Sequence, residues 1–256
     1  MLSFDDQVPA LDNAVSKDIL FRVPNWAVAY AADDTSHVIP ILREATNILL
    51  RKELTQPSAS DVEAAMCDAY SRILSGHVAR EYLTKFGLGS VDDFKIAGAS
   101  ALGRRLFWSL SRKIDKTSLG VDLLVYGFDY TNNRRPNLFH ITNPGNSSEL
   151  NHLSAFAVGA GTRMAMASLH LRPLDISTVP NGSTLVYRLC EAKFSSETAS
   201  SVGKATSGYW MTNDGHSGPI LEMTLNKYRN IWETWRRQPP PEEALNLMTE
   251  FHSRPP

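Results

Sequence analysis

The sequence predicts an α+β fold in which two sheets are stacked between layers of helices. The chain has 256 residues, of which 43% are hydrophobic and 21% are charged, and these values are ordinary for a globular protein. Strand-like stretches occur in separate groups, and paired stretches with the spacing of amphipathic helices follow two of these groups. The order is strands, two helices, strands, two helices, strand, which is typical of a layered fold.

The N-terminal part of the chain is expected to form strands and then a helix. Residues 18–23 (DILFRV) and 26–31 (WAVAYA) have strand composition and are joined by Pro24-Asn25, a pair that favours a tight turn. The polar residues 33–35 offer N-caps for a helix that runs to about residue 51, because apolar side chains then recur at three- and four-residue spacing.

A second long helix is expected from residue 61 to about residue 86. Residues 60–63 (SDVE) fit a capping box at its start, and Gly87 fits a stop at its end. Residues 91–116 have a mixed pattern that predicts helix over part of their length. They end in the basic run RKIDK, residues 112–116, which is expected to be a solvated face.

The pattern changes to strands near residue 119. The continuous apolar stretch 119–130 and the shorter stretch 136–142 predict neighbouring strands, since turn residues separate them. The elements expected after them are a short strand at 155–158, helices at 162–171 and 183–200, a strand at 206–212, and helices at 219–237 and 242–251. We expect one domain over residues 1–237, followed by a Pro-rich breaker and C-terminal helix or tail at 238–256.

Composition argues against several classes of protein. The net charge is -1, so the chain as a whole has no electrostatic attraction to nucleic acid or to anionic lipid, and we expect neither as a partner. No apolar run reaches the length of a membrane span, and the first residues lack the features of a signal peptide. Cys67 and Cys190 are too few and too distant for a disulfide framework or a cysteine zinc site, which favours reduced thiols and a cytoplasmic location.

Other chemical motifs are weak. The seven histidines show no ligand spacing, so we expect no metal and no cofactor. Gly203-Lys204 lacks the upstream glycine of a phosphate-binding loop. Trp108, Trp232 and Trp235 are expected to be packing or interface residues.

The segment 120–214 resembles the C-terminal half of proteasome β-type subunits and their bacterial relatives. The matching stretches are LLVYGFD at 123–129, NLFHI at 137–141 with the following NPG, FAVGAG at 156–161, EAKF at 191–194 and SVGK at 201–204. Residues 21–50 also fit, with a strand and then AADD opening a long helix. The resemblance implies the four-layer αββα sandwich of N-terminal-nucleophile (Ntn) hydrolases.

The resemblance also implies a catalytic apparatus. Family members that cleave peptides use a Thr at the mature N-terminus, whose α-amine acts as the general base because its pKa lies near the working pH. A lysine lowers the pKa of the nucleophile and an aspartate pairs with that lysine. Lys17 matches this lysine by context, and Asp5 (or Asp6) matches the aspartate.

Two further segments match supporting parts of the family site. The turn at Gly159, Gly161 and Thr162 matches the segment that carries a supporting serine and oxyanion-binding backbone N–H groups, with Thr162 as the hydroxyl. Glu197 and Ser200 match an acid and hydroxyl pair spaced by three residues, with Glu in place of the usual Asp.

The nucleophile itself has no counterpart in the sequence. The family places it well before the aspartate, and only four residues precede Asp5 here. Three explanations stay open: a relative that lacks the nucleophile, a true start upstream of Met1, or Ser3 exposed by processing and acting as a shifted nucleophile.

Three functions follow from these alternatives. The first is a non-catalytic or assembly subunit, the second is a threonine-type peptidase or amidase subunit with its true N-terminus upstream, and the third is a small-molecule binding module that uses the vacant cleft. The resemblance implies a homo-oligomer or a ring with related subunits, and a peptide as the substrate of the catalytic form. Proteolysis is implied for the catalytic form, and the cytoplasmic location expected from the two cysteines applies to all three functions.

Overall fold

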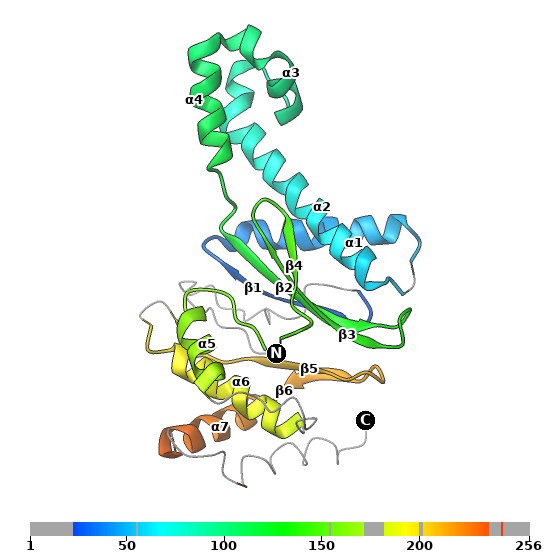
Figure 1. The fold of residues 1–256 in the computed structure, drawn as a ribbon, viewed down its shortest axis with the longest axis vertical. Helices are drawn as coiled ribbons and strands as arrows, with labels where there is room; N and C mark the ends of the chain where they lie inside the picture. Colours follow the sequence, from blue (N-terminus) through cyan, green and yellow to red (C-terminus); the bar gives the residue numbers. More distant parts are fainter. Residues whose placement is uncertain are drawn as a thin grey trace. The chain divides into compact units, whose positions relative to one another are not determined.

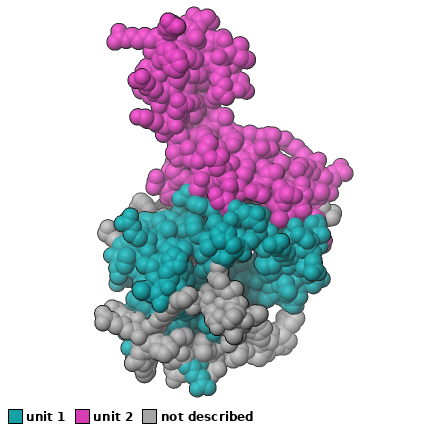
Figure 2. All heavy atoms as spheres, in the orientation of Figure 1, with its two compact units in different colours: residues 1–31, 122–140, 149–256 teal, residues 32–121, 141–148 magenta. Residues whose placement is uncertain are grey.

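The structure is a computed structural model that describes residues 23–54, 56–153, 155–171, 182–199, 202–235 and 242. The chain divides into two compact units (Figure 2). Unit 1 comprises residues 1–31, 122–140 and 149–256, and unit 2 comprises residues 32–121 and 141–148. All of the strand expected at residues 18–23 except Val23, and all of the helix expected at 242–251 except residue 242, lie outside the described residues.

Four strands form one sheet in the order β1-β2-β3-β4 (Figure 1). They are β1 (Trp26–Ala32), β2 (Val121–Asp129), β3 (Arg135–Thr142) and β4 (Asn146–Glu149). The first three confirm predicted strands. β4 was not predicted, because its sequence NSSE has neither apolar alternation nor β-branched residues.

The prediction of a strand at residues 155–158 is wrong. These residues have no strand pairing. Val158 is instead buried in a cluster with Ala29, Ala31 and Leu124, and Phe156 packs against this cluster. The apolar run therefore covers strands β1 and β2 without joining a ladder, and apolar content by itself does not distinguish these two outcomes.

A second, two-stranded sheet in unit 1 pairs β5 (Gly208–Met211) with β6 (Ser217–Ile220). The pairing is antiparallel, with Gly208 opposite Ile220 and Met211 opposite Ser217. The strand expected at 206–212 is confirmed over its central part. The helix expected from residue 219 is wrong at its start, since residues 217–220 form β6 and the helix begins at Glu222.

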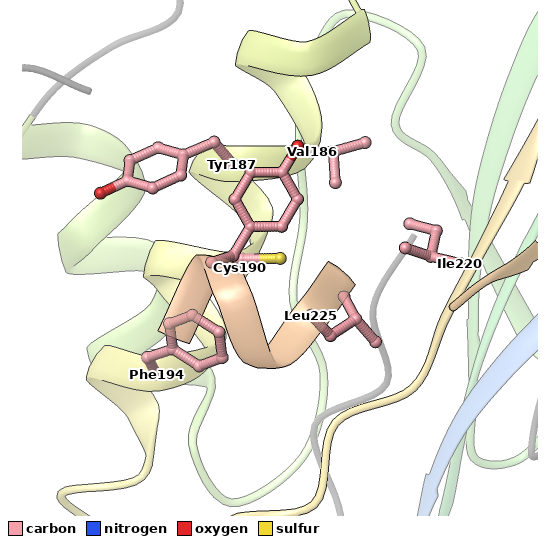
Figure 3. Close-up of a cluster of buried hydrophobic side chains, with 7 residues drawn as sticks. Val186, Tyr187, Cys190, Phe194, Ile220 and Leu225 are labelled. Carbon is pink, nitrogen blue, oxygen red and sulfur yellow. The ribbon is translucent and has the colours of Figure 1, made fainter. Parts of the chain in front are cut away.

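Unit 1 contains three helices, and two of them enclose a buried aromatic cluster together with β6. The three helices are α5 (Thr162–Leu171), α6 (Gly182–Ser196) and α7 (Glu222–Trp235), and the first two confirm the expected helices. Figure 3 shows the cluster between α6, α7 and β6, with Cys190 near its centre. Its buried members are Val186, Tyr187, Cys190, Phe194, Ile220, Leu225 and Tyr228. This packing fixes α7 against α6.

Unit 2 is mainly helical. A 3-10 turn at Thr35–His37 leads into α1 (Val38–Arg51), and α1 packs on α2 (Ala59–Val78). Both helices were predicted from the sequence. The second helix continues through a π turn and a 3-10 turn and stops at Gly87, whose φ is 75°. The mixed segment 91–116 forms two helices, α3 (Val91–Leu102) and α4 (Arg104–Asp115).

The capping box of α2 differs from the predicted one. The N-cap is Ser58, not Ser60: its side chain accepts a bond from the Asp61 backbone N–H, and the Asp61 carboxylate accepts one from the Ser58 backbone N–H. The helix therefore starts two residues earlier, at Ala59. A Ser-x-x-Asp spacing serves as well as the expected Ser-x-x-Glu, since either carboxylate can reach back to the N-cap.

Candidate functional site

Four of the seven predicted site residues are described: Gly159, Gly161, Thr162 and Glu197. Lys17, Asp5 and Ser200 lie outside the described residues. The four described residues belong to unit 1, and they lie in two segments that meet at the C-terminal end of α6. The described part of the candidate site therefore lies at this helix end.

The glycine turn before α5 packs closely against α6. Gly159 has a φ of 97°, a conformation that favours glycine. A Cβ on Gly161 would lie 2.7 Å from the Cβ of Ser196 and 2.9 Å from Val202 Cγ2. Thr162 closes the turn, because its Oγ1 donates to the Gly159 carbonyl at 2.6 Å. The hydroxyl predicted to support catalysis is thus bonded within its own turn.

A buried lysine lies one helical turn before Glu197. The Lys193 side chain is fully buried, and its Nζ donates to Glu197 Oε1 at 2.9 Å and to the Gly203 carbonyl at 2.6 Å. A charged ammonium is costly to bury unless it is paired and hydrogen-bonded. The two contacts meet that requirement and tie the chain after α6 to the helix.

Arg229 of α7 binds the same carboxylate. Its Nη1 donates to Glu197 Oε2 at 2.6 Å and its Nη2 donates to Glu197 Oε1 at 2.7 Å. The guanidinium also donates to the Lys204 carbonyl at 2.6 Å and to Thr206 Oγ1 at 3.1 Å. It lies 4.3 Å from the centroid of the Phe194 ring, which favours a cation by its π face. We call Lys193, Glu197 and Arg229 the α6–α7 ion cluster.

The surroundings of the ion cluster favour the ionised form of Glu197. Burial by itself raises the pKa of this carboxyl, since only 7% of the side chain is exposed. The hydrogen bonds from Arg229 and Lys193 outweigh that effect and hold the pKa below its usual value. The hydrogen bond to Glu197 in turn raises the pKa of Arg229. Glu197 and Arg229 are therefore both ionised at neutral pH.

The two cysteines are poor nucleophiles. Burial raises the pKa of the Cys190 thiol to about 12. Burial, with the nearby Glu63 and Asp68 carboxylates, raises the pKa of Cys67 to about 11. Because the thiolate is the reactive form, neither residue suits covalent catalysis at neutral pH.

The described part of the chain also lacks two other kinds of feature. It holds no group of three or more His, Cys, Asp or Glu side chains arranged to bind a metal ion. None of the helices described is long and apolar enough to cross a membrane.

Sequence reasoning found Glu197 but missed both of its partners. Lys193 precedes Glu197 by four residues, the spacing at which helical side chains meet, so this pair had a local signal. Arg229 is 32 residues away and had none. Only the packing of α7 on α6 brings it to the carboxylate.

Comparisons with known proteins give a likeness of fold. No protein-family model matches the chain. No curated protein matches it in sequence either. Among solved structures, an Anbu (Gly-1) mutant from Hyphomicrobium sp. strain MC1 is similar, with a TM-score of 0.57 and 15% sequence identity over 93% of this chain and 90% of that chain. At this identity the likeness supports a proteasome-like fold of mixed helix and sheet, and nothing about activity.

Proposed function

We propose that this protein is a non-catalytic, assembly-type subunit with a proteasome-like fold. The proposal includes the four-layer αββα sandwich and a single domain over residues 1–237. The likeness to the Anbu structure over most of both chains supports it. It also includes assembly into a homo-oligomer or a ring with related subunits, as the family resemblance implies.

The observation that carries the non-catalytic part is the state of the Glu197 carboxylate. Both of its oxygens accept hydrogen bonds from Arg229, and Oε1 accepts another from Lys193. A catalytic carboxylate needs at least one oxygen directed at a reacting group or at the group that activates it. The Thr162 hydroxyl is likewise bonded to Gly159. These contacts suit a structural cluster better than a reaction centre.

The peptidase alternative uses the same fold with a different N-terminus. It keeps Lys17 and Asp5 as the pair that activates an N-terminal Thr, Ser or Cys, and Glu197 with Ser200 as supporting groups. Its supporting observation is that the Gly159–Thr162 turn and the end of α6 lie together, so that both segments matched by the resemblance meet in the fold.

The test combines assembly with active-site labelling on the protein purified from its native source. Native mass spectrometry should show a defined oligomer. A peptide carrying a mechanism-based electrophile, such as an epoxyketone, should leave the mass of the chain unchanged. A labelled N-terminal residue, with label lost in Lys17→Ala, would establish the peptidase alternative. A strictly monomeric protein would count against assembly.

A further inference from the structure

Helix α4 in unit 2 has an inner face that belongs to a hydrophobic cluster. Leu110 is buried there with Phe94, and Phe107 and Ile114 pack against the cluster. The Phe94 and Phe107 rings stack with their centroids 4.8 Å apart. Figure 1 shows α3 and α4 side by side, as this contact requires. These residues account for the stability that α4 gains from packing.

The opposite face of α4 carries a tryptophan between arginines. At 3.6 residues per turn, Arg105, Trp108 and Arg112 fall on one stripe turned away from Leu110, and Lys116 continues it. All four are exposed, and the Trp108 side chain is 59% exposed. The Trp108 ring meets the edge of Phe107, with centroids 5.6 Å apart. We call these four residues the α4 stripe.

Positive charge is concentrated around this stripe. Residues 104–116 contain five Lys or Arg residues and one acidic residue, Asp115, in a chain whose net charge is -1. Within the part of the chain that the structure describes, none of these five basic side chains has an ion pair. The charge of the stripe therefore faces solvent.

We propose that the α4 stripe is a docking site for an amphipathic helix of a protein partner that presents carboxylates beside its apolar face. Trp and Arg are the residue types that dominate the energetic centres of protein–protein interfaces, and here they alternate on one exposed helix face. Charge complementarity supplies the carboxylates, because an arginine fork binds a carboxylate with two hydrogen bonds. This inference is independent of the proposed function.

Two other occupants fit the stripe less well. A membrane-surface helix needs a broad apolar face, and the stripe holds one apolar side chain among cations. Single-stranded nucleic acid is bound by several aromatic platforms along a basic groove, and the stripe offers one aromatic side chain on a convex helix. Both serve as outcomes of the test.

The test measures binding of a short amphipathic helical peptide whose polar face carries glutamates, by fluorescence anisotropy on the full chain. The same peptide with glutamine in place of glutamate is the charge control. Trp108→Ala and the pair Arg105→Glu with Arg112→Glu should each weaken binding roughly tenfold or more. Matched controls on α1, Leu50→Ala and the pair Arg43→Glu with Arg51→Glu, change exposed residues of the same kinds and should bind normally.

Several results would overturn the proposal. One is no saturable binding of the glutamate peptide, and another is equal binding of the glutamine peptide. Equal loss in the α1 controls would show a nonspecific charge effect. Tighter binding of oligothymidine or of phosphatidylserine vesicles, lost in the stripe variants, would assign the surface to those ligands. Self-association lost only in the stripe variants would assign it to a second copy. Circular dichroism melting of every variant separates loss of binding from loss of fold.

Discussion

The guanidinium of Arg229 holds both carboxylate oxygens of Glu197, with Nη1 2.6 Å from Oε2 and Nη2 2.7 Å from Oε1. This two-bond geometry is stronger and more directional than a single ionic contact. It joins α7 to the C-terminal end of α6 in unit 1. The stability of this part of the chain should therefore depend on one carboxylate.

Replacing Glu197 with glutamine should destabilise the protein by about 3 kcal/mol, because it removes the negative charge that the buried Lys193 and the partly buried Arg229 both contact. Urea unfolding of the parent and the variant measures the change in the free energy of unfolding, provided that the two proteins have equal m values. Glu81→Gln is the matched control, since Glu81 is exposed and should change stability by less than about 0.5 kcal/mol. Equal stability of Glu197→Gln and the parent would mean that the contact contributes nothing net.

The same contact should give stability a defined pH dependence. The pKa of Glu197 is lower in the folded protein than its usual value near 4.5, so the contribution is complete above that value. It is lost as the pH falls through the lower pKa of the folded state. Unfolding free energies of the parent and Glu197→Gln should therefore differ by a constant amount near neutral pH and converge in acid. A difference that stays constant into strong acid would contradict this account.

Replacing either of two glycines with alanine should change the stability of the protein, in opposite directions at the two positions. Gly161→Ala should destabilise by about 1–3 kcal/mol, since the new methyl group would overlap Ser196 and Val202. Gly76→Ala is the matched case: Gly76 lies inside α2, nothing is within 4 Å of its Cβ position, and helix propensity favours alanine by about 1 kcal/mol. Thermal melts of the two variants give the comparison. A stabilised Gly161→Ala protein would show that the turn can move away from α6.

Both cysteines should be unreactive in the folded protein. With the pKa of Cys67 raised to about 11 and that of Cys190 to about 12, little thiolate is present near neutral pH. Ellman's reagent should react slowly with the native protein. In guanidinium, it should react at once with two thiols per chain. If one thiol of the native protein reacts rapidly, the Cys67→Ser variant shows which cysteine it is. That cysteine would then lie in a more open environment than the structure shows.

Elements with their own local signal were predictable from the sequence. α1, α5 and β2 follow from periodicity or continuous apolar character, and each was found near its predicted bounds. β6 had a signal that was overlooked, because Asn213-Asp214-Gly215 is a hairpin-type turn and Gly215 has a φ of 94°. β4 had none.

The candidate site was predictable only in part, because some of its contacts have no local signal in the sequence. The glycine turn and Glu197 stand out in the sequence as a pattern, but what the carboxylate does depends on Arg229, which reaches it through tertiary packing. A motif shows which residue types are present, and the fold decides which groups they meet. Lys193 illustrates the difference, since its place in the sequence gives no sign of its complete burial.

The ion cluster also bears on how unit 1 opens and closes locally. Through Lys193, Glu197 and Arg229, three segments share one set of contacts: the end of α6, the backbone at Gly203 and Lys204, and α7. No one segment can detach while the other two keep all of their bonds. Amide hydrogen exchange in these segments should therefore proceed by joint openings of a single cooperative unit. Glu197→Gln should accelerate exchange in all three segments together.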